Sequence, residues 1–226
     1  MFPVLVLAGG FGTRLRSELK GLPKPLAPVD GKPFLFWLLK NLERQGVEEV
    51  VLSLYHQAEL IEHALEEMKF SMRVRTIIEP TPLGTGGAAA YVVHQKEGIE
   101  DFLLLNGDTW LGDSIVDMLN TISPAVGLVE VSDTSRYGRV EWNEDMVSQF
   151  LEKQPDDSQG WINGGIYHLH ASEFNNWNGT AFSLERDYLP ECVRERRLHA
   201  QPLQTDFIDI GVPESYKYIC SKGVMQ

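Results

Sequence analysis

The stretch from residue 3 to residue 25 constrains the fold more than any other part of this 226-residue chain. A short apolar run, residues 3–7, passes directly into a glycine-rich segment, residues 8–15. An apolar run of this length that ends in glycines is typical of a buried parallel strand followed by a loop. Because glycine allows tight turns and close approach, the N–H groups of such a loop can surround phosphate oxygens. With Arg14 and Lys24 nearby, we expect a polyphosphate site here.

The loop differs from the two common phosphate-binding motifs. It lacks the lysine–serine/threonine end of the P-loop and the spacing of the dinucleotide fingerprint. A glycine-rich turn alone can also serve only to pack a helix against a sheet. The longer string, residues 7–15 followed by Lys24 and Pro25, resembles the signature of the sugar-phosphate nucleotidyltransferases. That resemblance implies nucleotide binding by the residues of this loop, namely Leu7, Ala8, Gly9, Gly10, Gly12 and Thr13.

Composition limits the kinds of partner. Hydrophobic residues make up 43% and charged residues 23% of the chain, which is ordinary for a globular protein. The net charge of −12, without a basic tract, argues against nucleic acid or an anionic membrane surface as partner. Cys192 and Cys220 lack metal-ligand spacing and favour a reducing compartment. The N-terminal apolar run is too short for a signal peptide or membrane span, so we expect a cytoplasmic protein.

Strand and helix patterns alternate through the first half. Apolar runs predict strands at 49–54, 74–78 and 102–105, and helical spacing predicts helices at 34–45, 57–68 and 88–94. This rhythm predicts an α/β fold with a Rossmann-like, mostly parallel (mixed) sheet and helices on both faces. The second half is richer in strands, predicted at 126–130, 139–142, 147–151, 161–169 and 207–210, with helices at 171–177, 184–194 and 214–220. We expect a single domain over 1–226, with a nucleotide-binding half (1–120) and a sugar-phosphate-binding half (121–226).

Residues 79–87 follow the third predicted strand and open a helix. The free N–H groups of a helix start suit a polar planar ligand or an anion, although the segment could also be an ordinary loop. In the family that the chain resembles, the matching segment forms the wall against the nucleotide base. The resemblance implies base-reading roles for Glu79, Pro82, Gly84 and Thr85.

Two aspartates, Asp108 and Asp209, each lie at the end of an apolar run and close to a glycine. Asp108 comes just after a buried strand with Gly107, and a carboxylate on the same rim as a phosphate loop is well placed for Mg²⁺, which takes one or two carboxylates plus phosphate oxygens. The alternative is a simple Asn-Gly-Asp turn. Asp209 in the 207–213 segment is the second candidate. Asp108 and Asp209 match the two metal-binding aspartates of the family, and we expect Gly107 beside the nucleotide.

Three further segments resemble the sugar-phosphate pocket of the family. Glu152 could accept hydrogen bonds from sugar hydroxyls while Lys153 neutralises the 1-phosphate, although a solvated Glu–Lys pair is an equal alternative on the residues alone. Asn163 and Gly164 bring an amide and a position of close approach, suited to hydroxyl recognition. The backbone at Tyr137 and Gly138 resembles the step that faces the sugar.

The expected reaction is nucleotidyl transfer, in which a sugar 1-phosphate oxygen attacks the α-phosphorus of a nucleoside triphosphate. Both reactants are anionic, so the protein must hold them together and neutralise charge. We assign the leaving pyrophosphate to Arg14, the α-phosphoryl oxygens to Lys24 and the sugar phosphate to Lys153, with Arg14, Lys24 and Asp108 as catalytic residues.

Within the family, the short length and the 85–87, 162–167 and 208–213 segments resemble the heptose 1-phosphate guanylyltransferases. GTP is favoured because guanine presents two adjacent donors that one carboxylate, Glu79, can accept. A uridylyl- or thymidylyltransferase for a hexose or amino-sugar 1-phosphate is the nearest alternative. A non-catalytic sugar-nucleotide-binding subunit should lack some of the charged residues named above, and a nicotinamide-dependent dehydrogenase would need a different loop. The sequence leaves the oligomeric state open and is compatible with a homodimer.

Overall fold

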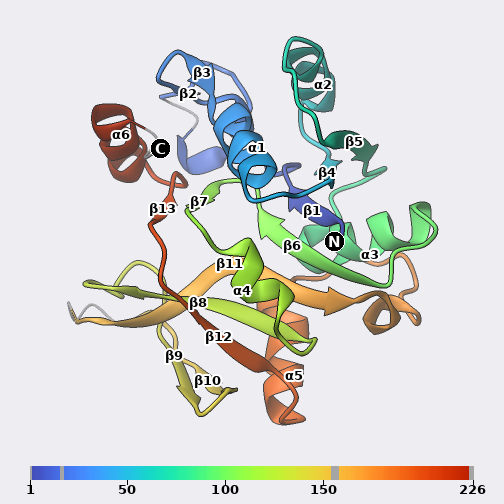
Figure 1. Cartoon of the computed structure of the whole chain (residues 1–226), viewed down its shortest axis with the longest axis vertical. Helices are drawn as coiled ribbons and strands as arrows, with labels where there is room; N and C mark the ends of the chain where they lie inside the picture. The colour runs from blue at the N-terminus through green and yellow to red at the C-terminus, as the bar shows by residue number, and fades with distance from the viewer. Residues whose placement is uncertain (1, 16–17, 154–157, 224–226) are drawn as a thin grey trace.

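The computed structural model describes residues 2–15, 18–153 and 158–223 of the chain. The first half builds four parallel strands, β1 (Val4–Leu7), β4 (Glu49–Leu54), β5 (Arg73–Ile78) and β6 (Asp101–Asn106), in the order β5-β4-β1-β6. Helices α1 (Phe34–Arg44), α2 (Ala58–Glu66) and α3 (Gly84–Gln95) lie between them in the chain (Figure 1). Because the strands are parallel, all four carboxyl ends meet at one edge of the sheet.

The second half extends the same sheet. β11 (Gly160–His170) pairs antiparallel with β6 on one side and with β8 (Ala125–Val131) on the other. The order continues through β12 (His199–Leu203) and β10 (Met146–Phe150) to β9 (Val140–Asn143), so the main sheet has nine strands among the described residues. The predicted mixed α/β sheet is confirmed, and β11 joins its two halves.

A hydrophobic core covers each face of the sheet. Val4 and Val6 of β1 belong to the core that includes α1 and α2, whereas Leu5 belongs to the core that includes α3 and α5 (Leu189–Arg194). This alternation is the two-residue period of a strand that is covered on both sides. All three side chains are fully buried, and each such burial contributes roughly 1.5–3 kcal/mol. The strand that carries the glycine loop is therefore firmly anchored.

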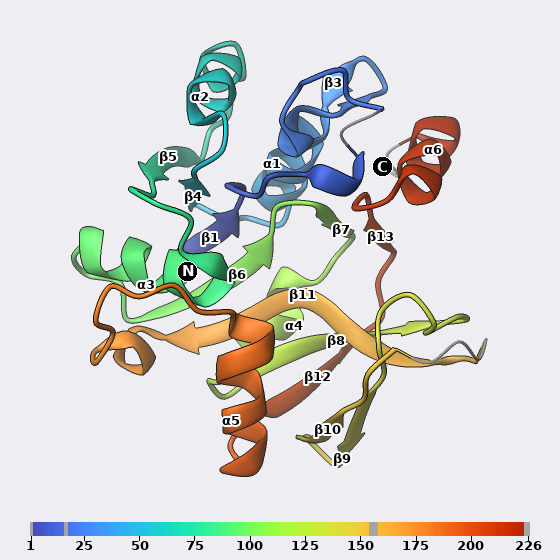
Figure 2. The ribbon, with the colours of Figure 1, turned by 180° about the vertical axis from the view of Figure 1, so that it is seen from behind.

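A two-stranded ribbon lies apart from the main sheet. β7 (Thr109–Leu111) follows β6 closely and pairs antiparallel with β13 (Phe207–Asp209), so that Asp209 lies opposite Thr109. The chain then forms α6 (Pro213–Lys222), which packs beside the N-terminal hairpin of β2 (Pro28–Val29) and β3 (Lys32–Pro33) (Figure 1 and Figure 2). There the Tyr216 hydroxyl donates to the Pro28 carbonyl at 2.8 Å. The C-terminal segment thus returns to the region in which β1 ends.

The predicted elements are mostly confirmed. Every predicted strand is present with each end within one residue of its predicted position. The helix predicted over 171–177 is wrong, since only a 3₁₀ turn forms at Ala171–Phe174. Asparagine-rich residues 175–179, which end in a glycine, are poor helix formers.

Other elements were extended or missed. The segment 184–194 begins with a π-helical turn, Leu184–Tyr188, before α5. The helix predicted at 88–94 begins earlier, at Gly84. Its glycine-rich first turn has no apolar periodicity, so the sequence pattern did not reveal it. The strands that were not predicted are β2, β3, β7 and β12, and the α-helix that was not predicted is the short α4 (Ile115–Leu119). None of the helices in the described part of the chain has the length and apolar character that crossing a bilayer requires.

Candidate functional site

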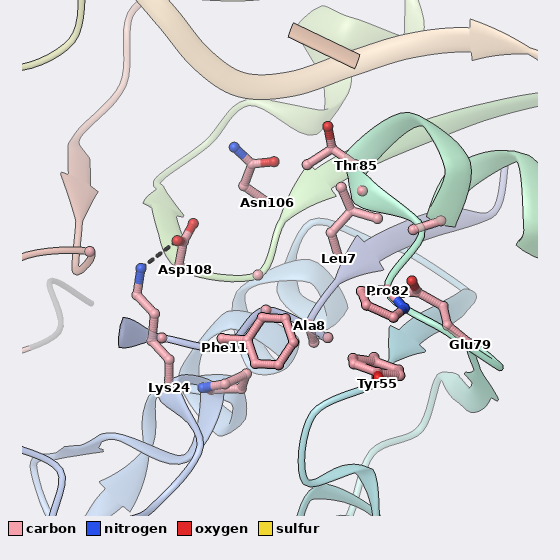
Figure 3. Close-up of a pocket in the computed structure, with 18 of the residues that line it drawn as sticks. Leu7, Ala8, Phe11, Lys24, Tyr55, Glu79, Pro82, Thr85, Asn106 and Asp108 are labelled. Atoms are coloured by element: carbon pink, nitrogen blue, oxygen red, sulfur yellow. Dashed lines mark hydrogen bonds and ion pairs between the residues drawn. The ribbon is translucent and has the colours of Figure 1, made fainter. Parts of the chain in front are cut away.

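A cavity of about 390 Å³ opens where β1, β4, β5 and β6 end (Figure 3). Its lining comes from the ends of β1 and β6, the loops after these four strands and the start of α3, together with Lys24, Pro25 and Gly211. All predicted nucleotide-binding and catalytic residues line it: Leu7, Ala8, Gly9, Gly10, Gly12, Thr13, Arg14, Lys24, Glu79, Pro82, Gly84, Thr85, Gly107 and Asp108. The structure therefore brings together residues that the sequence separates by up to a hundred positions.

The glycine loop needs glycine at particular positions. Gly12 has a positive φ of 58°, a conformation that side chains disfavour. At Gly107, a Cβ would lie 2.5 Å from the Leu7 carbonyl oxygen, so only glycine lets the ends of β1 and β6 approach. Arg14 lies exposed at the mouth of this loop, within a 3₁₀ turn at Thr13–Leu15.

Lys24 and the two predicted metal ligands lie together at one side of the cavity. The buried Lys24 side chain forms an ion pair with Asp108, which Figure 3 shows as a dashed line. The ribbon places Asp209 next to Asp108, since the Ile210 N–H donates to the Asp108 carbonyl at 3.0 Å. A Cβ on Gly211 would lie 3.1 Å from Lys24 Nζ and 2.6 Å from Asp209 Oδ1. One ammonium thus lies close to both carboxylates.

Glu79 is a buried carboxylate in the wall of the cavity, 7% exposed. Its Oε1 accepts a hydrogen bond from Ser53 Oγ at 2.9 Å and its Oε2 accepts one from the Leu83 N–H at 3.2 Å. Burial raises the pKa of Glu79 above its ordinary value, while these two donors act in the opposite direction. Since each carboxylate oxygen has a second lone pair, Glu79 can still accept from a ligand.

The start of α3 is less open than the sequence suggests. The N–H groups of Gly86 and Gly87 donate to the Phe182 carbonyl at 3.1 and 3.3 Å, and the Phe182 N–H donates to Leu83 at 3.0 Å. The prediction that these helix N–H groups await a ligand is wrong for Gly86 and Gly87, because a loop from the second half caps them. Gly84 and Thr85 remain in the cavity lining.

The predicted sugar-phosphate residues lie outside the lining of this cavity. Two of the predicted segments pack on each other: a Cβ on Gly138 would lie 2.7 Å from the Leu151 carbonyl oxygen and 3.7 Å from Lys153 N. Tyr137 packs edge-on against Phe207, two residues before Asp209, with ring centroids 5.5 Å apart. Burial raises the pKa of Tyr137. Glu152 and Lys153 are exposed.

Asn163 and Gly164 lie on β11 where its pairing with β8 shifts register. The Asn163 side chain is already engaged, since Nδ2 donates to the Tyr167 hydroxyl at 2.9 Å and Oδ1 accepts from the Gly165 N–H at 2.9 Å. Gly165 in turn lies against Asn106, whose Nδ2 would be 2.7 Å from an added Cβ. Because Asn106 lines the cavity, β11 passes directly beside it.

The lining also contains Phe11, Tyr55 and Asn106, for which no role was predicted from the sequence. Phe11 is 53% exposed and packs edge-on against Tyr55, with ring centroids 5.8 Å apart. Tyr55 directly follows β4 and Asn106 ends β6. The rule that parallel strands end at a common edge could have identified both of them.

Nearly the whole chain matches known proteins. The family model described as "Nucleotidyl transferase" matches residues 3–222. The chain is 38% identical over 215 residues to the D-glycero-alpha-D-manno-heptose 1-phosphate guanylyltransferase of Campylobacter jejuni subsp. jejuni, with 94% of this chain and 96% of that protein covered. It is 33% identical over 222 residues to the protein of the same name from Aneurinibacillus thermoaerophilus, with 94% of each chain covered.

Among solved structures, the chain is similar to HddC from Yersinia pseudotuberculosis complexed with GMP-PN. The TM-score is 0.87 and the sequence identity 35%, over 98% of this chain and 99% of the other.

Proposed function

Because the chain belongs to the nucleotidyl transferase family, we propose that it joins GTP to D-glycero-α-D-manno-heptose 1-phosphate. The products are GDP-heptose, a precursor of surface polysaccharide, and pyrophosphate. Two relatives more than 30% identical along nearly their full length bear the name of this activity. The observation that carries the proposal is the single cavity lined by every predicted nucleotide-binding residue.

The reaction needs charge neutralisation more than proton transfer. A sugar 1-phosphate oxygen attacks the α-phosphorus of GTP in line, and pyrophosphate leaves. The attacking phosphate is already ionised near neutral pH, so no general base is required. We assign Arg14 to the leaving pyrophosphate and Lys24 to the α-phosphoryl oxygens, with Lys153 holding the sugar phosphate. Against a net charge of −12, these cations provide the local attraction for two anions.

The cation that we propose is Mg²⁺, with Asp108 and Asp209 as its protein ligands. Both carboxylates lie near the Lys24 ammonium, so their negative charge already attracts one cation in this structure. No group of three or more acidic, histidine or cysteine side chains suited to a metal occurs among the described residues. Two carboxylates fit Mg²⁺, which completes its coordination with phosphate oxygens and waters. When bound, the ion supplies positive charge to the phosphate oxygens of both substrates.

On the sugar side, we propose that Glu152 and Asn163 bind heptose hydroxyls, with the backbone at Tyr137, Gly138 and Gly164 approaching the ring. The packing of Gly138 on the 151–153 segment supports this, because it makes two of the predicted sugar segments neighbours. We also propose that the enzyme works in the cytoplasm, where its free thiols, Cys192 and Cys220, would stay reduced.

One experiment tests the proposal. Pyrophosphate release is measured with Mg²⁺ across a grid of nucleoside triphosphates and sugar 1-phosphates. We expect the highest kcat/KM for GTP with the heptose 1-phosphate. Better turnover of UTP or dTTP with a hexose 1-phosphate would replace this proposal by a uridylyl- or thymidylyltransferase, and absence of turnover with every pair would favour a binding subunit.

The catalytic cations are tested in the same assay. Arg14→Ala and Lys24→Ala should both lower kcat, because these side chains face charge that redistributes in the transition state. Lys20→Ala, an exposed lysine near the same loop, is the matched control and should change neither kinetic constant. A normal kcat in either test variant would remove that residue from the mechanism.

A further inference from the structure

Ser53 is a polar residue in the buried part of an otherwise apolar strand. From Val50 to Leu54 every side chain of β4 is buried, and Ser53 alone among these five carries a polar group. It is 1% exposed. Burying a hydroxyl costs free energy unless the hydroxyl finds a hydrogen-bond partner. The Ser53 hydroxyl donates to Glu79 Oε1 at 2.9 Å, so its partner is a residue of the cavity wall.

The backbone of Ser53 supports the glycine loop on the other side of this carboxylate. Ser53 lies opposite Leu7 in the pairing of β4 with β1, and its carbonyl accepts from the Ala8 N–H at 2.9 Å. A Cβ added to Gly9 would lie 3.1 Å from Glu79 Oε1, so the carboxylate lies against the loop. Ser53 therefore holds both the start of the loop and the carboxylate that packs on it.

The two oxygens of Glu79 have one protein donor each. Ser53 Oγ donates to Oε1 at 2.9 Å, and the Leu83 N–H donates to Oε2 at the longer distance of 3.2 Å. The terminal torsion of a glutamate is soft, so one donor alone would leave the carboxylate group able to turn. Two donors fix its plane, and with it the directions of the lone pairs that remain for a ligand.

Glu79 lies away from the charged end of the cavity. Figure 3 shows Glu79 on one side of the cavity and the ion pair of Lys24 and Asp108 on the other. A nucleotide that binds its α-phosphate at Lys24 therefore directs its base toward Glu79. A residue that holds Glu79 acts on the recognition of the base and not on the reacting phosphorus.

We propose that Ser53 is a positioning residue for base recognition. It holds the Glu79 carboxylate in the plane in which its free lone pairs meet the two adjacent donors of guanine. Ser53 itself touches no substrate and acts only through Glu79. The inference rests on the proposed function, because it takes GTP as the nucleotide and Glu79 as the residue that reads its base.

The test is steady-state pyrophosphate release by the full chain with Ser53→Ala, using GTP and UTP. The KM for GTP should rise about 3- to 10-fold, while kcat for GTP and KM for UTP stay near the wild-type values. Ser114→Ala is the matched control, because Ser114 is also a buried serine, 3% exposed, but lies before α4 and outside the cavity lining. Its GTP:UTP ratio of kcat/KM should equal that of the wild type. An unchanged ratio in Ser53→Ala overturns the proposal.

A second substitution covers the case in which Ser53→Ala does not fold, as judged by its melting temperature. Ser53→Cys keeps a side chain of similar size, but a thiol is a weak donor. It should show the same loss of preference for GTP over UTP. Retention of the full preference in Ser53→Cys would then refute the role of Ser53.

Coupling to Glu79 separates positioning from a general effect on the fold. In a Glu79→Gln background the carboxylate is absent, so Ser53→Ala should change the GTP:UTP ratio little further. The two substitutions should therefore be strongly non-additive in this ratio. If Ser53→Ala lowers the ratio by the same factor in both backgrounds, Ser53 does not act through Glu79 and the proposal fails.

The pH profile gives a readout that a purely structural role would not move. Burial raises the pKa of Glu79, whereas the hydrogen bond from Ser53 lowers it. Without that bond the pKa rises further, so the preference of Ser53→Ala for GTP over UTP should begin to decline at a higher pH than in the wild type. Ionisation of the phosphates is common to both nucleotides and cancels in the ratio. A profile that is not displaced contradicts the proposal. The substitution leaves unchanged the other ionisable residues of the lining, which are Arg14, Lys24, Tyr55 and Asp108.

Failure of the proposed function gives a different result. A wild type that prefers another triphosphate refutes the proposed function. The coupling of Ser53→Ala with Glu79→Gln is then measured for that triphosphate, where additivity overturns the positioning role. A wild type that prefers GTP, with a Ser53→Ala variant that keeps the full preference, refutes only the role of Ser53.

Discussion

Replacing Glu79 with glutamine should weaken the discrimination between GTP and UTP. In the structure, the Glu79 carboxylate accepts from Ser53 Oγ at 2.9 Å and from the Leu83 N–H at 3.2 Å. A backbone N–H cannot accept, so a glutamine must turn its oxygen to Leu83 and its NH₂ to Ser53, whose hydroxyl can accept. The variant keeps both internal hydrogen bonds, and we expect it to fold. It presents an N–H group where the wild type presents a second acceptor oxygen.

The size of the effect follows from the count of hydrogen bonds. Guanine brings two adjacent donors, and the glutamine can accept only one of them. A hydrogen bond to a charged group is worth about 1.5–3 kcal/mol, so kcat/KM for GTP should fall about 10- to 150-fold. For UTP it should hold or rise, since the amide can donate to a uracil carbonyl. The assay is pyrophosphate release with each triphosphate. Glu59→Gln, exposed on α2, is the matched control.

The pH dependence of the wild-type preference for GTP over UTP offers a second measurement. Burial raises the pKa of Glu79 above its ordinary value of 4.5. As the pH falls through that raised value, the carboxyl takes up a proton and loses an acceptor. As the pH is lowered, the wild-type preference for GTP over UTP should therefore begin to decline at a higher pH than it would if the glutamate were exposed. The preference of the Glu79→Gln variant should not change with pH. If the variant keeps the wild-type GTP:UTP ratio, or keeps its pH dependence, Glu79 does not read the base.

Three further predictions concern the cation site, the sugar side and the packing of α3. Asp108→Asn and Asp209→Asn should each lower kcat roughly 100-fold or more while the protein stays folded; near-normal Mg²⁺-dependent turnover in either variant excludes that aspartate as a ligand. Lys153→Ala should raise KM for the sugar phosphate and leave GTP binding unchanged in a titration, whereas the opposite result would reverse our assignment of the two halves. Gly86→Ala should lower the melting temperature by several degrees, because a Cβ there overlaps the Phe182 ring and overpacking costs about 1–3 kcal/mol. Adding Phe182→Leu should recover part of that loss, and an unchanged melting temperature in Gly86→Ala would contradict the packing.

Most of the lining of the proposed nucleotide cavity could be predicted because each of its parts is local in the sequence. The loop after β1 and the segment after β5 are contiguous motifs, and Asp108 follows directly on β6. A parallel sheet brings such strand ends together whatever their separation along the chain. For the same reason, the place of Tyr55 in the lining could have been predicted from the sequence, although Tyr55 belongs to no recognisable motif.

What could not be predicted depends on contacts between distant segments. Pro202 lacks an N–H group and argues against an interior strand, yet β12 lies between β8 and β10. The parallel pairing with β8 decides the matter, and no local pattern encodes it. The cap on Gly86 and Gly87 likewise comes from Phe182, in the other half of the chain. Without knowledge of that loop, the closed start of α3 could not be recognised.

The pairing of β7 with β13 has a consequence for how the enzyme is made. Asp108 is synthesised in the first half of the chain, but Asp209 joins it only through a strand near the C-terminus. β12, which fills the gap between β8 and β10, comes from the same final segment. A ribosome-bound chain that ends before residue 199 therefore holds most of the proposed nucleotide cavity, but it lacks a complete sheet and one of the two aspartates of the proposed cation site. Catalytic activity and the complete fold both require the C-terminal segment, so partial translation products should be inactive.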